Sequence, residues 1–534
     1  MKKALHNSVL VFSILLLSTN AYSQNSFEKD IEQYSKSISL PGLAVGVVKD
    51  GKLIFFKAIG KADSARTEVI TADHIFGIAS LTKSFTSVLF QKLEAESKLS
   101  LNDPIDKFPN KYFTKERWYS NTTLAHILSQ TSESEPIGTG FAYNGSKFNL
   151  VYNALSSIYN LPDNDGVYRN FTQPIEEKIL RPLQMSHTLV RYNEQEFGSL
   201  KKWIVCPHYW DTKDSTWKSR PIRLKNIQSG PGFGMMSSMD DLVKYCNALD
   251  QNTLITKEQY REITTPFYTG SPYGTGWFVT DFEGVKMDWV YGYGDYDASI
   301  LLKIPSERLS LIVLSTSSLI SQSTSLGFGN PLNSPIICSF LRNFVNNKST
   351  TFYRRLAIEE SFSQAIVLLF APSGLVSQKE NTAEKLTLLL KKYPKASIWQ
   401  TPTFFELAAK SQHKELMNFA LEQYKLIKNQ PNNHPALQYY AGEIAGKTNN
   451  QTLQIEIFTK LSGGESFKEQ GYKLNAMFWL GNYYLSKNGI ENGKELLQRF
   501  LKYKEHFSNI DAQYKEAKKL LDDLYKIPQM IDKK

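Results

Sequence analysis

Cysteine is scarce in this chain of 534 residues. The sequence holds three cysteines, Cys206, Cys246 and Cys338, which are odd in number and far apart. At most one disulfide bond can form among them, so the chain is not a small disulfide scaffold. Its length predicts two or three domains with ample core, held together by ordinary packing.

Metal-ligand spacings are absent as well. The eight histidines form no H-x-x-H or H-x-H pattern, and the cysteines form no C-x-x-C pair. Zinc sites draw their ligands from such clusters. We therefore expect no metal site and no cofactor.

Charge is not concentrated in any one segment. The formal net charge is +10, and it falls to +8 when Lys2 and Lys3 leave with a signal peptide. The lysines are scattered, and there is no arginine-rich arm. Proteins that bind nucleic acid gather their basic residues on one face or in one arm. The charge therefore indicates solubility and no nucleic-acid partner.

Long hydrophobic runs are missing, and the one apolar stretch near the start is short. Residues 1–23 combine Lys2 and Lys3 at a basic end, an apolar stretch over Val9–Leu17, and Ala21-Tyr22-Ser23. This pattern is typical of a secretory signal peptide cleaved after Ser23. Because spanning a bilayer takes roughly 20 apolar residues, an uncleaved anchor is the weaker alternative. We expect a periplasmic or secreted protein with no stable membrane anchor.

The chain changes character near residue 348. Residues 24–348 mix strand and helix signals, whereas residues 349–534 are rich in Lys, Leu and Tyr and periodic at helical spacing. The polar stretch 346–351 lies between apolar helical segments. We predict a mixed domain over 24–348 and an all-helical domain over 349–534.

Two segments of the helical region are loosely alike, Pro435–Gly442 and Ala476–Tyr484. The second resembles the first helix of a tetratricopeptide repeat, with large residues and a glycine where helices pack closely. Two readings stay open. The region is a tetratricopeptide-like repeat able to bind a protein partner, or it is a helical cap on the first domain.

The strongest candidates for catalytic residues are Ser80 and Lys83, which form an S-x-x-K motif. Residues three apart on a helix project from the same face. A serine at a helix start lies among unpaired backbone N–H groups at the positive end of the helix dipole. A neighbouring lysine amine can assist removal of the hydroxyl proton, which makes the serine a nucleophile.

The spacing alone is weak evidence, because it recurs at Ser26–Lys29, Ser215–Lys218 and Ser411–Lys414. Context distinguishes Ser80. Upstream, Asp50-Gly51 lies between two apolar runs, which predicts a β-hairpin. Downstream, apolar residues repeat at helical spacing. We predict a hairpin followed by a helix that opens with the nucleophile.

Tyr143 is a candidate general base. It follows a glycine-rich turn over Gly138–Gly140 and precedes a helix-like segment over Phe148–Leu155. A tyrosine near a nucleophilic serine can take a proton when a neighbouring cation lowers its pKa. The alternative is an ordinary core or surface tyrosine, one of 28 in the chain.

Residues 41 to about 316 resemble the serine β-lactamase-related hydrolases, which include class C β-lactamases, D-alanyl-D-alanine peptidases and related esterases. The motifs that carry the resemblance are Pro41–Val45, Ile78–Thr86, Leu99–Pro104, Leu124–Ser132, Phe141–Asn144, Gly230–Leu242 and Tyr273–Trp277. The resemblance implies an α/β (α+β) fold with an antiparallel sheet flanked by helices, built from the N-terminal hairpin and strands near 275–315.

The resemblance also implies catalytic roles. Ser80 matches the acylated nucleophile, Lys83 the lysine that assists proton transfer, and Tyr143 the tyrosine of the Tyr-x-Asn motif. The backbone N–H of Ser80 would supply half of the oxyanion hole, and an N–H from a late strand the other half.

The chain departs from the family pattern at three places. Tyr-x-Asn reads Tyr143-Asn144-Gly145, and Leu-Ser-His-Thr-Ser-Gly reads Leu-Ser-Gln-Thr-Ser-Glu over residues 128–133. The third motif should offer Lys or His, then any residue, then Gly, and no placement on Trp289–Tyr296 provides the cation. We expect Tyr291, Tyr293 and Gly294 to form the substrate-binding segment there, with their register open.

The sequence therefore predicts a secreted serine hydrolase that works through an acyl-enzyme on Ser80. The substrate could be a small ester, a D-amino-acid peptide or amide, or a β-lactam. The alternative is a catalytically weak penicillin-binding-like protein that binds a peptide or cell-wall fragment. The missing cation favours this alternative, and the intact Ser80, Lys83 and Tyr143 oppose it.

Overall fold

The computed structural model describes residues 24–62, 68–109, 118–134, 136–162, 168–190, 198–220, 229–347, 349–372, 374–375, 379–411, 413–429, 434–463, 470–504 and 512–531. The predicted signal peptide lies outside them, and it stays a prediction, as does the domain boundary near residue 348. The described chain divides into two compact units. The first contains the described residues of Met1–Lys92, Leu161–Thr265 and Gly276–Leu389, and the second those of Leu93–Asn160, Pro266–Thr275 and Leu390–Lys534.

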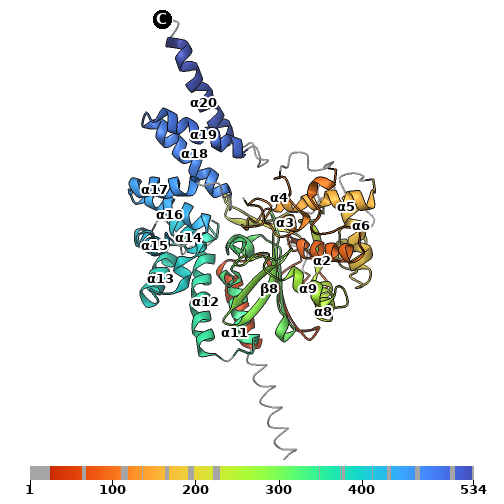
Figure 1. The fold of residues 1–534 in the computed structure, drawn as a ribbon. Helices are drawn as coiled ribbons and strands as arrows, with labels where there is room; N and C mark the ends of the chain where they lie inside the picture. Colours follow the sequence, from red (N-terminus) through yellow and green to blue (C-terminus); the bar gives the residue numbers. More distant parts are fainter. Residues whose placement is uncertain are drawn as a thin grey trace, which may run out of the picture. The chain divides into compact units, whose positions relative to one another are not determined.

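A six-stranded antiparallel sheet forms the centre of the first unit (Figure 1). The strand order is β2 (Lys52–Gly60), β1 (Gly42–Lys49), β10 (Leu309–Ser315), β9 (Ala298–Ile304), β8 (Val285–Tyr293) and β7 (Phe278–Phe282). The β1–β2 hairpin turns at Asp50 and Gly51, whose φ angles of 52° and 75° suit the turn that Asp-Gly favours. The predicted antiparallel sheet, built from the early hairpin and the late strands, is confirmed.

Helices cover both faces of this sheet. A Cβ built on Gly46 would touch Met239 of α8 (Met239–Asp250). Phe55 pairs with Val47, the residue next to Gly46, so it points to the opposite face. There its ring packs on Phe344 of α11 (Pro335–Phe344), with the ring centroids 6.3 Å apart.

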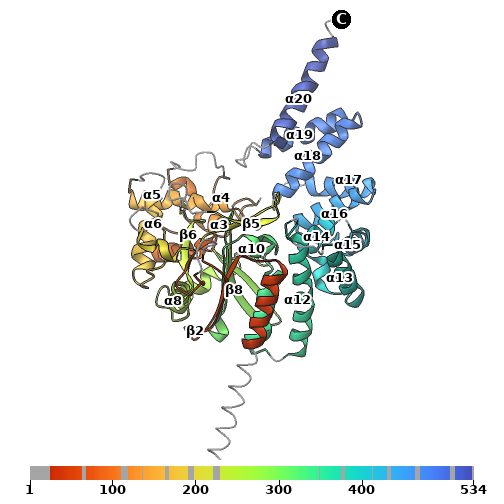
Figure 2. The ribbon, with the colours of Figure 1, turned by 180° about the vertical axis from the view of Figure 1, so that it is seen from behind.

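A helix over residues 24–37 lies on the same face as α11. Arg342 of α11 bonds to Asp30 of this helix and to Glu360 of α12 (Thr350–Phe370), at 2.7 and 2.8 Å. Figure 2 shows the N-terminal helix in red beside α12. The N-terminal helix and the consecutive helices α11 and α12 therefore form one helical layer.

Two two-stranded sheets are separate from the main sheet. β3 (Ile75–Ala79) pairs with β6 (Met235–Ser238), and β4 (His208–Asp211) pairs with β5 (Thr216–Ser219). The helix expected to open at the nucleophile, α2 (Thr82–Ala95), follows β3. The remaining α-helices that lie within the first unit are α6 (Arg169–Ile175), α9 (Lys257–Ile263) and α10 (Leu319–Gln322).

The second unit is helical. Its helices before residue 160 are α3 (Leu124–Leu128), α4 (Gly145–Phe148) and α5 (Tyr152–Tyr159). Its later helices are α14 (Pro402–Ser411), α15 (Lys414–Ile427), α16 (Pro435–Lys447), α17 (Gln451–Ser462), α18 (Gln470–Ser486), α19 (Ile490–Lys504) and α20 (Ala512–Ile531), and α13 (Lys379–Lys392) precedes them across the unit boundary. The elements described after residue 349 are all helices, as predicted.

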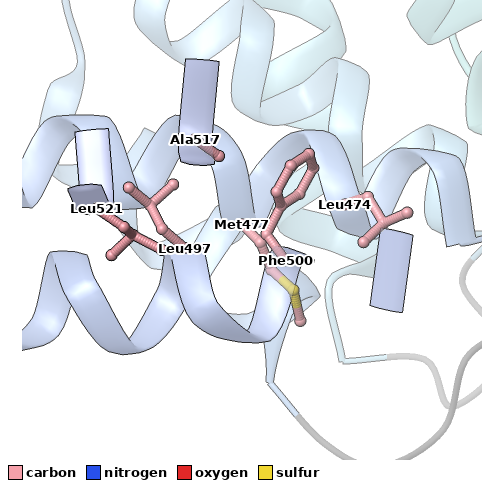
Figure 3. Close-up of a cluster of buried hydrophobic side chains, with 6 residues drawn as sticks. All are labelled: Leu474, Met477, Leu497, Phe500, Ala517 and Leu521. Atoms are coloured by element: carbon pink, nitrogen blue, oxygen red, sulfur yellow. The ribbon is translucent and has the colours of Figure 1, made fainter. Parts of the chain in front are cut away.

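The late helices pack as successive pairs, α14 on α15, α16 on α17 and α18 on α19. Glycines let the pairs approach closely, because a Cβ at Gly442 would touch Phe458 and one at Gly481 would touch Leu497. Figure 3 shows the core between α18, α19 and α20. Its buried residues are Leu474, Met477, Leu497, Phe500, Ala517 and Leu521. Within the described residues, no helix has the length and apolar character needed to span a membrane. A tetratricopeptide-like role for this region stays a prediction.

Candidate active site

Ser80 lies in a sharp turn between β3 and α2. The preceding residue, Ala79, has a φ of 45°, in the left-handed region that residues with a Cβ seldom adopt. Such a conformation costs on the order of 1–3 kcal/mol and tends to occur at functional sites. The helix begins at Thr82 rather than at Ser80, because a strand and a tight turn, with Lys83 N bonded to Ser80 O at 3.0 Å, come first.

Thr82 holds this turn in place from inside the protein. It is buried, and its Oγ1 donates to the Ala79 carbonyl at 2.7 Å and accepts from Met235 N at 3.2 Å. One hydroxyl therefore joins the end of β3, the start of α2 and the first residue of β6. The strained residue before the nucleophile is supported by elements far apart in sequence.

Lys83 lies beneath Ser80. Its Nζ is 2.8 Å from Ser80 Oγ and 2.7 Å from the Gly232 carbonyl oxygen, and the side chain is 1% exposed. Burial lowers the pKa of Lys83 from 10.5 to about 7. A large fraction of the amine is therefore neutral near pH 7, where it can accept the Ser80 proton.

The Ser215–Lys218 motif shows what the same spacing does in another environment. Lys218 Nζ bonds to Asp211 at 2.5 Å and to Asp214 at 2.7 Å, and its side chain is 40% exposed. The hydrogen bonds that the Lys218 ammonium donates to these two carboxylates, first Asp211, raise the pKa of Lys218. An ammonium held in this way cannot take a proton from a serine.

The loop over Gly230–Gly234 supplies contacts that the sequence analysis did not assign. Gly232 O bonds to Lys83, and Thr86 Oγ1 of α2 donates to Pro231 O at 2.6 Å. The loop closes on itself through Gly230 N to Phe233 O at 2.9 Å, and Gly234 has a φ of 100°. The Gly-Pro-Gly-Phe-Gly composition signals a tight turn, but not its contact with Lys83.

The third-motif segment on β8 faces β3. Ser299 Oγ, opposite Gly292, donates to Ile78 O at 2.7 Å, and a Cβ built on Gly292 would overlap that carbonyl. Gly292 therefore lies against the strand that leads to Ser80 and leaves no room for a side chain. A Cβ at Gly294 would be 3.5 Å from Ala79 Cβ, so Gly294 is also beside the nucleophile turn.

Tyr291 and Tyr293 point to the other face of β8, because neighbours of Gly292 alternate with it. Tyr291 is buried and packs on Phe278 and Trp289, with ring centroids 5.8 and 6.1 Å away. Tyr293 is 53% exposed. Of the three residues expected to bind substrate, Gly294 is the one placed beside Ala79; the binding roles themselves stay predictions.

Tyr143 belongs to the second unit, where its ring packs edge-on against Tyr273 at 6.3 Å. The altered motif residues around it form one cluster. Asn144 N donates to Gln130 Oε1 at 2.7 Å, and Asn144 Nδ2 donates to both Glu133 oxygens at 3.1 Å. Gln130 and Glu133, the two residues that depart from the Leu-Ser-His-Thr-Ser-Gly pattern, thus both bond to Asn144, next to the altered position Gly145. The catalytic role of Tyr143 stays a prediction.

These groups suit acyl transfer. Ser80 and Lys83 provide a nucleophile and a buried amine at hydrogen-bonding distance, which is the pairing that activates a serine. Over the described residues, no three His, Cys, Asp or Glu side chains are grouped as metal ligands.

Comparisons with known proteins agree with this geometry. The chain is 25% identical over 329 residues to Protein flp of Staphylococcus aureus (strain MW2), covering 55% of this chain and 63% of that protein. It is 23% identical to Beta-lactamase of Escherichia coli (strain K12), covering 46% of this chain and 67% of that protein. The chain thus spans less than two thirds of the length of Protein flp.

The fold is also that of a solved penicillin-binding protein homologue from Pyrococcus abyssi, described as octameric. The TM-score is 0.51 at 22% identity, over 63% of this chain and 81% of that one. The family described as Beta-lactamase matches residues 27–323, which is more than half of the chain. The chain belongs to the Beta-lactamase family.

Proposed function

We propose that this chain is a secreted serine hydrolase that works through an acyl-enzyme on Ser80. The observation that carries the proposal is the 2.8 Å contact between Ser80 Oγ and Lys83 Nζ, with the lysine buried and its pKa lowered to about 7. Burial disfavours the charged form of a lysine, so the neutral amine is favoured at the position where it faces Ser80 Oγ.

The reaction follows from this pair. Ser80 Oγ attacks the substrate carbonyl carbon while its proton passes to the neutral Lys83 amine. The oxyanion is stabilised by the backbone N–H of Ser80 and by a second N–H beyond β8. The leaving group departs with the proton, with Tyr143 as a candidate relay, and water then hydrolyses the Ser80 ester.

A covalent probe tests this directly. Treatment with a fluorophosphonate or a labelled penicillin, followed by peptide mapping, should place the adduct on the peptide that contains Ser80. The decoy Ser215 provides an internal control, since its lysine neighbour is held charged by carboxylates. Failure of every probe to label Ser80 would favour the weakly catalytic binding protein instead.

The absence of a cationic side chain at Gly292 predicts which acyl groups the protein prefers. Where relatives offer a cation, this segment offers a glycine with no room for a side chain. A charge-assisted hydrogen bond is worth about ten- to a hundredfold in binding. We expect kcat/KM for 4-nitrophenyl butyrate to exceed that for the mono-4-nitrophenyl ester of succinic acid, a matched acyl group that ends in carboxylate, by about this factor. Penicillins should likewise be poor substrates.

The butyrate and succinate esters release the same leaving group, 4-nitrophenol. They therefore differ mainly in the charge of the acyl group. The kcat/KM of both esters should be measured at several salt concentrations. Salt screens the long-range field of the protein more strongly than it screens a close contact, so a preference that persists at high salt indicates a close contact. A better rate with the succinate ester would mean that another cation lines the site.

A further inference from the structure

The loop that joins β8 to β9 places a carboxylate beside the nucleophile turn. The loop closes through Gly294 N donating to Asp297 O at 3.0 Å. The Asp297 carboxylate lies between two glycines, since a Cβ built on Gly77 would overlap Oδ2 and one on Gly294 would overlap Oδ1. Gly77 belongs to β3, two residues before Ala79, and Gly294 lies against Ala79 itself.

This carboxylate has no donor of its own. Within the part of the chain that the structure describes, no side chain or backbone N–H bonds to either oxygen of Asp297, and it forms no ion pair. Burial, assisted by the nearby Asp295, raises the pKa of the Asp297 carboxyl to about 6. Among the described residues no cation pairs with this carboxylate, so its charge is left to attract a positively charged ligand group.

A cation that contacts this loop, Arg220, comes directly after β5 and faces another group. The Arg220 guanidinium lies over the Tyr296 ring, with its carbon 4.3 Å from the ring centroid. It therefore stacks on the loop, and it makes no ion pair with Asp297 among the described residues. Asp297 itself is partly exposed, so a ligand can reach it.

We infer that Asp297 binds an ammonium group of the substrate, next to the carbonyl that Ser80 attacks. The inference rests on the proposed acyl transfer at Ser80 and names its substrate class: amides and esters whose acyl group carries a free amine, as in an amino acid with an unblocked amino end. In such a group the nitrogen is one carbon away from the reacting carbonyl. The charge at this position is thus opposite to the cation that the third motif supplies in relatives.

The groups around the nucleophile turn also carry little positive charge that would repel an ammonium group of the substrate. Gly292 offers no side chain that would repel an ammonium, and the pKa of Lys83, lowered to about 7, leaves about half of its amines uncharged near pH 7. An α-amino group has a pKa of about 7.7–8.0, so it is mostly charged at pH 7.0, where Asp297 is mostly ionised.

The test uses the full-length protein and four substrates, the 4-nitroanilides of D- and L-alanine with the amino group free or acetylated. At pH 7.0 we expect kcat/KM to be about ten- to a hundredfold higher for the free amine of the accepted isomer. Asp297→Asn keeps the shape and removes the charge, and it should remove most of this preference by slowing the free-amine substrate. Asp295→Asn, two residues away and exposed, is the matched control and should change the preference less than threefold.

Two further readouts separate the possible failures. The rate of Ser80 labelling by a neutral fluorophosphonate reports the nucleophile, and the unfolding midpoint reports the fold. Wild-type protein whose Ser80 is never labelled overturns the proposed function and this inference with it. If Ser80 of the wild type is labelled but kcat/KM is no higher for the free amine than for the acetylated substrate, this inference alone is overturned. Another outcome is that Asp297→Asn lowers kcat/KM for the free and the acetylated substrate, and the rate of Ser80 labelling, by the same factor. That result would show that the carboxylate positions the nucleophile turn, and it would also overturn the inference.

Discussion

Replacing Ser80 by alanine is expected to abolish the acyl-enzyme and to lower kcat by about 10⁶-fold, the size seen when a serine hydrolase loses its nucleophile. The reason is chemical rather than structural. The variant keeps the turn, because Thr82 and the Lys83 N to Ser80 O bond hold it through groups that alanine retains. Without the hydroxyl, however, no ester can form, and water would have to attack unaided.

The measurement is intact-protein mass spectrometry after treatment with the probe, together with turnover of a neutral nitrophenyl ester. Ser215→Ala is the matched control, since it alters the same motif in β4–β5 and should leave labelling and turnover as in the wild type. An adduct that persists in Ser80→Ala, or that vanishes in Ser215→Ala, would assign the nucleophile elsewhere.

Replacing Lys83 by methionine is expected to lower kcat/KM by about 10²- to 10⁴-fold, the usual contribution of a general base. Methionine fills most of the buried space and removes the amine. In the wild type, kcat/KM should rise with pH through about 7 and then level off, because the reactive form is the neutral amine and the pKa of Lys83 is lowered to about 7. Below that pH the rate should fall tenfold per unit.

Lys218→Met removes the exposed lysine of the decoy motif and should leave both the rate and the pH profile unchanged. Lys83→Met should keep a cooperative unfolding transition, which shows that the loss is catalytic. If the step near pH 7 survives in Lys83→Met but is lost in Tyr143→Phe, the tyrosine is the base and the lysine only positions Ser80.

Local sequence determined the elements around the site. Asp50-Gly51 specifies its hairpin, because its two residues readily adopt positive φ angles in a two-residue turn. The apolar residues at helical spacing after Ser80 form α2, and the Lys- and Leu-rich region after residue 349 folds as helices. The strand β3 was not predicted, since five residues with a glycine carry little periodic signal.

Sequence also named the residues that the family pattern shares, Ser80 and Lys83, and it exposed the missing third-motif cation. The S-x-x-K spacing alone could not separate Lys83 from Lys218, because both lie three residues after a serine, and the flanking hairpin, helix and family motifs were needed to choose Ser80. The distinction is environmental. Segments distant in sequence bury Lys83, whereas two nearby carboxylates hold Lys218 at the surface.

Only the tertiary structure decided how the site is assembled. The carbonyl that meets Lys83 comes from Gly232, 149 residues away, and the carboxylate beside Ala79 comes from the β8–β9 loop. The register of β8 decided that Gly292 faces the nucleophile strand while Tyr291 and Tyr293 face away. A pKa, a register and an unpaired charge depend on which groups meet across the fold, and local sequence carries no such information.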